Sequence, residues 1–138
     1  MNEDRTVFLV DDEPAVLKAL SRLLRAEGYK TQLFDSGREF ISKHRSGAAG
    51  CILLDISMPG MTGLEVQQRL TDSGILLPVI FLTAQNDVHD RVQALMLGAV
   101  DVLMKPVSAG RLLKALREAF AQLQAGAAEV TRQGRDGK

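Results

Sequence analysis

Polar side chains follow four short apolar segments of this 138-residue chain, and together they could bind a divalent cation and a phosphoryl group. Asp11 and Asp12 follow the first segment, Asp55 the second, Thr83 the third and Lys105 the fourth. Carboxylate oxygens without a nearby set of His and Cys favour Mg²⁺ or Mn²⁺ over Zn²⁺. A carboxylate can also act as a nucleophile and form an aspartyl-phosphate. A lysine ammonium and a hydroxyl could then hold the remaining phosphoryl oxygens.

Each of these residues also has an ordinary structural interpretation when it is taken alone. An Asp that follows a strand usually caps a helix or forms a turn, and Asp12 lies just before Pro14, which suits a first helical turn. A Thr in such a place is mostly structural, and a Lys before Pro is mostly a solvated charge. The joint placement of five polar residues after four predicted strands therefore carries the functional interpretation.

The elements that must position these residues alternate along the whole chain. Apolar segments typical of buried strands lie at residues 6–10, 30–34, 51–54, 79–82 and 102–104. Amphipathic helical patterns follow them and begin near Pro14, Ser36, Leu64, Val88 and Ser108. This alternation predicts an α/β fold, a (βα)5 doubly wound parallel sheet of five strands with helices on both faces. In such sheets ligands bind beyond the carboxyl ends of the strands, where the five polar residues lie.

Composition limits the classes of function. Apolar residues make up 46% of the chain, which suits one domain with a real core. The formal net charge is zero and Trp is absent, so direct nucleic-acid binding is not expected. No apolar run is long enough for a membrane span, and the N-terminus does not resemble a signal peptide, so a cytoplasmic location is expected. The single cysteine, Cys51, lies in a predicted strand and is expected in the core.

Four groups of residues resemble the receiver domain of bacterial two-component response regulators. The similarity covers roughly residues 5 to 124, and the groups occur in the family's order and spacing. They are Phe-Leu-Val-Asp-Asp-Glu at 8–13, Leu-Asp-Ile-Ser-Met-Pro-Gly-Met-Thr-Gly at 54–63, Phe-Leu-Thr-Ala at 81–84, and Gly-Ala-Val-Asp at 98–101 with Lys105-Pro106. The resemblance implies a flavodoxin-like sheet with strand order 2-1-3-4-5.

The resemblance also implies roles for individual residues. Asp55 would accept a phosphoryl group from a sensor histidine kinase. Mg²⁺ or Mn²⁺ would be held by Asp11, Asp12, Asp55 and the backbone carbonyl of Ser57. The phosphoryl group would be contacted by Thr83, Ala84 and Lys105. Thr83 would report phosphorylation, and Ser57 and Gln85 occupy positions that influence how fast the phosphate is lost.

One residue departs from the family pattern. The family pairs the Thr with an aromatic side chain on the fifth strand, whereas this chain has Val102 at that position. Val cannot swing between a buried and an exposed rotamer as Tyr or Phe does. The chemistry of phosphorylation is therefore expected to be complete, while the usual relay through Thr83 and residue 102 lacks its aromatic half.

The resemblance leads to a functional hypothesis with two alternatives. The chain is expected to be a phosphoacceptor switch and not an enzyme, with at most self-catalysed phosphoryl transfer and autodephosphorylation. A haloacid-dehalogenase-like phosphatase also uses Asp, Thr or Ser, Lys and Mg²⁺, but it needs an acid two residues after the nucleophile, where this chain has Ser57. A degenerate receiver that binds a partner without phosphate is disfavoured because all five site residues are present.

The boundaries and partners follow from the same hypothesis. Residues 1–124 are expected to form the receiver domain, and residues 125–138 a frayed helix end with a flexible tail or the start of a linker to an absent output domain. Expected partners are a histidine kinase and a second copy of the chain in a phosphorylation-dependent homodimer, with no membrane. An output through a DNA-binding domain outside this chain would make the regulator act on transcription. His44 and His89 are expected to be solvated surface residues.

Overall fold

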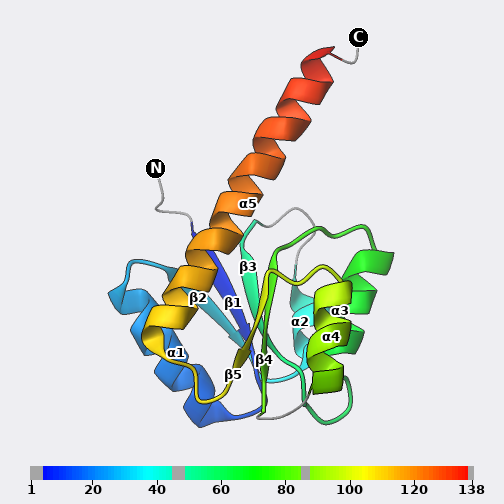
Figure 1. The fold of residues 1–138 in the computed structure, drawn as a ribbon. Helices are drawn as coiled ribbons and strands as arrows, with labels where there is room; N and C mark the ends of the chain where they lie inside the picture. The colour runs from blue at the N-terminus through cyan, green and yellow to red at the C-terminus, as the bar shows by residue number, and fades with distance from the viewer. Residues whose placement is uncertain (1–4, 45–48, 85–87, 137–138) are drawn as a thin grey trace.

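The computed structural model describes residues 5–44, 49–84 and 88–136, with side chains described up to residue 124. Strands and helices alternate strictly through these ranges (Figure 1). The elements are β1 (Thr6–Val10), α1 (Pro14–Ala26), β2 (Lys30–Phe34), α2 (Gly37–Lys43), β3 (Cys51–Asp55), α3 (Gly63–Asp72), β4 (Val79–Thr83), α4 (Val88–Met96), β5 (Asp101–Met104) and α5 (Ala109–Asp136).

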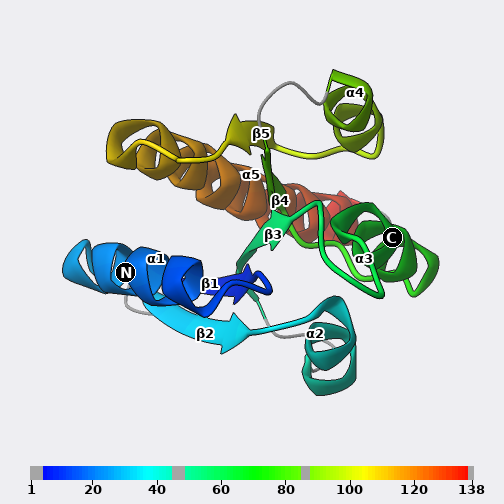
Figure 2. The same ribbon diagram turned by 90° about the horizontal axis from the view of Figure 1, so that it is seen from below.

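The five strands form one parallel sheet in the order β2-β1-β3-β4-β5. Helices α1 and α5 lie on one face of the sheet and α2, α3 and α4 on the other, as the view from below shows (Figure 2). The predicted (βα)5 doubly wound sheet and its strand order are therefore confirmed. Since all strands run in one direction, their carboxyl ends meet at one edge, which lies at the bottom of Figure 1.

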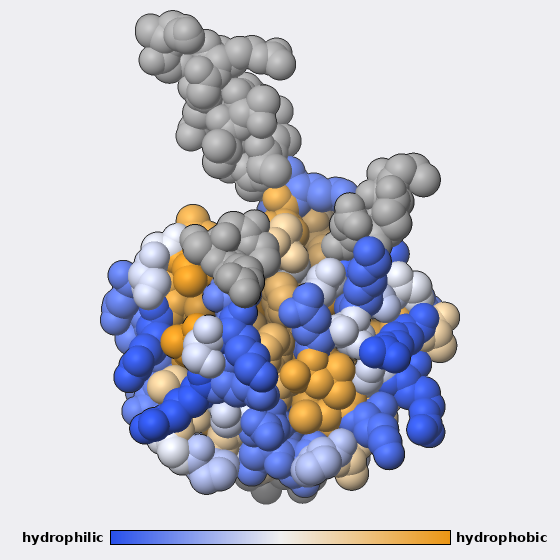
Figure 3. All heavy atoms as spheres, turned by 180° about the vertical axis from the view of Figure 1, so that it is seen from behind, coloured by the Kyte–Doolittle hydropathy of each residue, from blue (hydrophilic) through white to orange (hydrophobic). Residues whose placement is uncertain are grey.

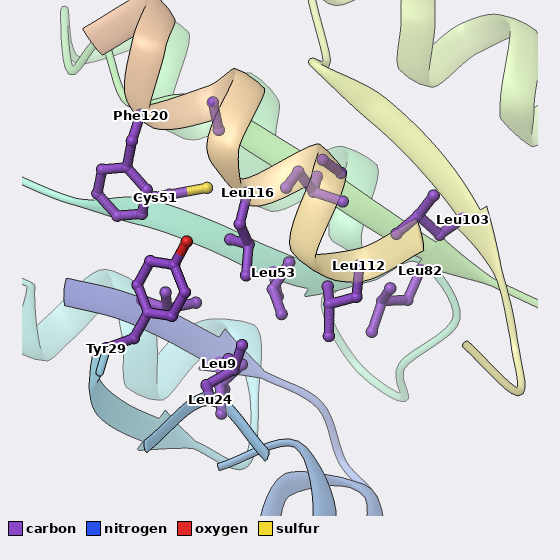
Figure 4. Close-up of a cluster of buried hydrophobic side chains, with 14 of the residues drawn as sticks. Leu9, Leu24, Tyr29, Cys51, Leu53, Leu82, Leu103, Leu112, Leu116 and Phe120 are labelled. Carbon is purple, nitrogen blue, oxygen red and sulfur yellow. The ribbon is translucent and has the colours of Figure 1, made fainter. Parts of the chain in front are cut away.

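The core is divided into two layers by the side-chain alternation of the strands. Val7 and Leu9 of β1 point to the layer under α1 and α5, whereas Phe8 and Val10 point to the layer under α2, α3 and α4. Figure 4 shows the first layer, in which leucines of α5 pack against side chains of the sheet. Cys51 belongs to this layer with 0% exposure, and burial raises the pKa of its thiol to about 12, so the predicted core role holds.

Local capping signals account for several helix starts. The backbone N–H of Glu39 donates to the Ser36 hydroxyl at 3.0 Å, and Thr62 forms a capping box at the start of α3. Ser108 accepts from the N–H of Arg111 at 3.3 Å, as predicted for the start of α5. The capping role considered for Asp12 is wrong, because the N-cap residue of α1 is Glu13 and it makes no side-chain cap hydrogen bond.

Helix α5 is longer than the sequence pattern suggested. A frayed helix end with a flexible tail, or the start of a linker, was predicted after residue 124; in the structure the helix continues to Asp136 and projects beyond the sheet (Figure 1). Extending a helix that is already anchored requires no new nucleus, and Ala, Gln, Glu and Arg in this stretch favour helix despite two glycines.

The two histidines have different environments. His89 is exposed, as expected. The expectation of a solvated His44 is wrong, because its ring stacks on Phe40 with centroids 5.1 Å apart and meets the edge of Phe8 at 5.3 Å. Both ring nitrogens are buried without a hydrogen-bond partner in the described part of the chain, and this burial lowers the pKa of His44.

Seen from behind, the surface of the molecule carries both charged side chains and a hydrophobic patch near its centre (Figure 3). Edge strand β2 lies on this side of the sheet, and its Leu33 is 41% exposed. Among the described residues, no helix combines the length and apolar character needed to cross a membrane.

Replacing Gly63 with Ala is expected to destabilise the domain by about 2 to 3 kcal/mol, which is the usual cost of overpacking. A Cβ at this position would collide with the Asp55 carbonyl oxygen and would lie 2.9 Å from the Cα of Ile56. Gly110→Ala is the matched control, because nothing lies within 4 Å of its added Cβ, and a stabilisation of about 0.5 kcal/mol is expected. Urea unfolding of both variants measures the difference, and equal stabilities would contradict the close approach at Gly63.

Candidate functional site

The acidic residues singled out in the sequence meet at the carboxyl edge of the sheet. Asp11 and Asp12 follow β1, and Asp55 is the last residue of the adjacent strand β3. One carboxylate oxygen from each lies within 4.8 Å of the other two. Asp11 and Asp55 are 2% and 3% exposed, while Asp12 faces solvent. The result is a half-open acidic site with a buried floor.

Lys105 joins this group from the residue after β5. Its Nζ lies 2.9 Å from Oδ2 of Asp11 and 3.4 Å from Oδ2 of Asp55. The backbone N–H of Lys105 donates to the carbonyl of Thr83 at 2.8 Å, which ties the residue to the end of β4. The peptide bond from Lys105 to Pro106 is cis. Through its two ion pairs with Asp11 and Asp55, the ammonium reaches across the sheet edge to the strands that carry the carboxylates.

Burial and like charge shift the acid–base behaviour of Asp55. Burial is the largest cause that raises its pKa, the charge of Asp11 raises it further, and Lys105 opposes both, so that the pKa of Asp55 is about 6. For Lys105, burial lowers the pKa, but the hydrogen bond to Asp11 and the charges of Asp55 and Asp11 outweigh it and raise the pKa overall. At neutral pH the site therefore holds an ionised Asp55 carboxylate beside a charged Lys105 ammonium.

The acidic group suits a divalent cation. Asp11 and Asp55 repel each other strongly enough to contribute to the raised pKa of Asp55, and a cation between them would relieve that repulsion. The oxygens come only from carboxylates, which are the donors that Mg²⁺ and Mn²⁺ prefer. Oδ1 of Asp11 already accepts the N–H of Glu13 at 2.9 Å, which orients this carboxylate toward the group.

The remaining residues from the sequence analysis lie around this group at different depths. Thr83 is 1% exposed, and its hydroxyl donates to the carbonyl of Ala84 at 3.2 Å. Ala84 is exposed, and Ser57 is exposed in the loop between β3 and α3. Val102 is 3% exposed and pairs in register with Phe81 of β4, in the core layer under α4. Gln85 lies outside the described residues.

Glu13 was not assigned a role from the sequence, yet its carboxylate contacts the same ammonium. Oε1 of Glu13 lies 3.2 Å from Nζ of Lys105, so that three carboxylates share one cation. The signal that could have found it is the run of three acidic residues after the first strand, of which only two were placed in the site. Glu13 is largely exposed, so its contact closes the outer rim of the site.

The fold and this arrangement define a class of protein, and comparison with known proteins agrees. The model of the response regulator receiver domain matches residues 7–117, and the chain belongs to that family. It is therefore a signalling domain of two-component systems and not a classical enzyme, which favours the switch hypothesis over the phosphatase alternative.

Individual relatives of the chain are also named as regulators. The chain is 38% identical over 119 residues to the response regulator protein TmoT of Ectopseudomonas mendocina, and the matched residues cover 86% of this chain and 54% of TmoT. It is 40% identical over 116 residues to the transcriptional regulatory protein TdiR of Thauera aromatica, and the matched residues cover 84% of this chain and 51% of TdiR. The structure of the response regulator StyR superimposes with a TM-score of 0.85 at 37% identity, over 96% of this chain and 66% of that one. The chain thus spans about half the length of these curated relatives.

Replacing Asp55 with Asn is expected to stabilise the metal-free domain at pH 8 by about 1 to 3 kcal/mol. A carboxyl whose pKa rises from 3.8 to about 6 on folding favours the protonated folded state, so its ionisation destabilises the fold as pH rises through this interval. The advantage of the Asn variant should be complete above pH 6 and should vanish below pH 4. Urea unfolding in EDTA across this range measures it, and an Asn variant less stable than the parent at pH 8 would contradict the raised pKa.

Proposed function

We propose that this domain accepts a phosphoryl group on Asp55 from the phosphohistidine of a sensor kinase and thereby changes a surface that controls an output. The observation that carries the proposal is the contact of Lys105 with Asp55, which forms an acidic group with Asp11 and Asp12 at the sheet edge. A nucleophile, a cation-binding group and an ammonium for the phosphoryl oxygens are the parts that phosphoryl transfer to an Asp needs.

The transfer step forms one bond and breaks one. An oxygen of the ionised Asp55 attacks the phosphorus atom, and the bond from phosphorus to the kinase imidazole nitrogen breaks, with its electron pair leaving on the imidazole. Lys105 stays beside the new acyl phosphate and balances the charge of its oxygens, since its ammonium already lies 3.4 Å from the Asp55 carboxylate. Thr83 and Ala84 would border the phosphoryl group at the end of β4.

A divalent cation, Mg²⁺ or Mn²⁺, would be held by Asp11, Asp12, Asp55 and the backbone carbonyl of Ser57. When bound, it would neutralise negative charge on the phosphoryl oxygens. The half-open position of the acidic group, with a buried floor and Asp12 facing solvent, leaves room for water and phosphoryl oxygens, which Mg²⁺ commonly keeps as ligands.

Transcription is the proposed output. The name of TdiR describes a transcriptional regulatory protein, and this chain covers about half of TdiR. We assign residues 1–124 to the receiver and residues 125–138 to a connection toward an output domain, with α5 providing the helix that leaves the receiver. The proposed site of action is the cytoplasm, where the kinase would deliver the phosphoryl group.

Incubation with phosphoramidate and MgCl₂ is expected to add the mass of one phosphoryl group to the parent protein and none to Asp55→Asn. Lys105→Ala should keep the fold but accumulate much less phosphoprotein, because the ammonium beside the acceptor is lost. Intact-protein mass spectrometry measures both. Undiminished labelling of the Asn variant would sink the proposal, and rapid multiple turnover of a phosphomonoester would support the phosphatase alternative.

Phosphorylation is further proposed to promote a homodimer through α4. Val88, Val92 and Leu95 follow one another at helical spacing and are 68%, 50% and 51% exposed, which leaves an apolar row on the outer face of this helix. Leu95→Glu is expected to prevent the dimer that beryllofluoride, a stable phosphoryl mimic, induces in the parent. Leu76→Glu is the control, since Leu76 is 86% exposed but lies outside α4. Light scattering measures the mass, and a dimer that survives Leu95→Glu but not Leu76→Glu would contradict this surface.

A further inference from the structure

Helix α4 contributes little to the core. Within its residues 88–96, all of which the structure describes, Ala94 is the buried side chain. The large apolar residues of the helix point outward, and Met96 is 81% exposed. By contrast, α5 buries Leu112, Leu116 and Phe120 against the sheet. The position of α4 must therefore depend on a small number of specific contacts.

One such contact lies at the carboxyl end of α4. The N–H of Ala99 donates to the carbonyl of Ala94 at 3.2 Å and the N–H of Gly98 to that of Leu95 at 3.0 Å, with Gly98 at a φ of 90°. This pattern ends a helix by satisfying its last carbonyls. The carbonyl of Leu97 takes its hydrogen bond from another helix, because Nε2 of Gln67 in α3 donates to it at 3.3 Å.

Gln67 is well suited to hold α4 in place. Its side chain is only 8% exposed, and a buried amide without a partner is costly, so its donor specifies one position of the Leu97 carbonyl. Helix α3 in turn starts beside the phosphoacceptor strand, where the N–H of Gly63 donates to the carbonyl of Ile56 at 2.8 Å. The hydrogen bond therefore connects the helix that follows Asp55 to the far end of α4.

The opposite side of α4 has room for movement. A cavity of about 360 Å³ is lined by Arg91 of α4, Arg111 of α5 and residues of β5 that include Val102. Val102 is buried under α4 and is too short and stiff at χ1 to change rotamer as an aromatic residue would. A displacement of α4 itself is thus the mechanically simplest way for this chain to change the surface near Thr83.

We propose that the hydrogen bond from Gln67 to Leu97 holds α4 in its resting position, and that phosphorylation of Asp55 acts by releasing it. The inference rests on the proposed function and names the residue through which this chain relays its signal. Gln67 is a positioning residue, since it touches neither the acidic group nor Lys105. By reciprocity, a domain in which the bond is already absent binds the phosphoryl mimic beryllofluoride more tightly, because the mimic favours the released state.

Gln67→Met tests the proposal, since Met has nearly the same length and volume but no amide donor. Gln68→Met is the matched control, because the amide of Gln68 is exposed and donates to Asp72 within α3. In the unmodified proteins, hydrogen exchange at the amides of Leu97, Gly98 and Ala99 should be about tenfold faster in Gln67→Met than in the parent. The Gln68 variant should match the parent, and the amides of β4 should not change.

Two further readouts separate this proposal from the proposed function. In the parent, beryllofluoride should accelerate exchange at the same three amides, and it should add little in Gln67→Met. Beryllofluoride should also bind Gln67→Met several-fold more tightly than the parent. The inference would be overturned by exchange at these amides that is equally fast in Gln67→Met and the parent. It would also be overturned if the parent is phosphorylated but beryllofluoride leaves the exchange of these amides unchanged. Absence of phosphorylation in the parent would instead overturn the proposed function, and exchange in the unmodified proteins would still report on the hydrogen bond.

Discussion

The structure depends on the close approach of three carboxylates to one lysine at the end of a parallel sheet. Asp11 and Asp55 are almost fully buried, and such a pair is unfavourable unless a cation accompanies it. Lys105 supplies one positive charge from the end of β5, two strands away from β3, which leaves an excess of negative charge. That residual repulsion makes the group receptive to a divalent cation, and the raised pKa of Asp55 is its measurable sign.

Holding like charges together requires a rigid support, and the core provides it. The central strands β1, β3 and β4 consist almost entirely of buried residues, so their ends cannot move apart without opening the core. The loop after Asp55 is similarly constrained, since Gly63 brings α3 against the backbone of Asp55 where any side chain would collide. The Asp55 carboxylate is thus placed by packing and the surrounding charges rather than by a flexible loop.

The surface that would report the reaction is built differently. Helix α4 buries one small side chain and leaves its large apolar residues exposed. The buried amide of Gln67 in α3 donates to the carbonyl of Leu97, just after the last residue of α4. Elements with few buried apolar contacts lie at the low end of local stability, where small changes in free energy move them. A rigid acidic site beside a weakly attached helix suits the proposed switch, in which the site would bind one group and the helix would then present a different surface.

Much of this could be predicted from the sequence, because local patterns report local structure. The apolar runs placed the strands to within a residue at each end, and Ser36 and Ser108 marked helix starts where they cap them. The rule that parallel strands end at one edge was enough to gather Asp11, Asp55 and Lys105. Only the tertiary structure decided that Glu13 contacts Lys105, that His44 is enclosed by Phe8 and Phe40, and that Gln67 bonds to Leu97. These contacts join side chains from different elements, and their geometry depends on how the helices pack, which no periodicity along the chain records.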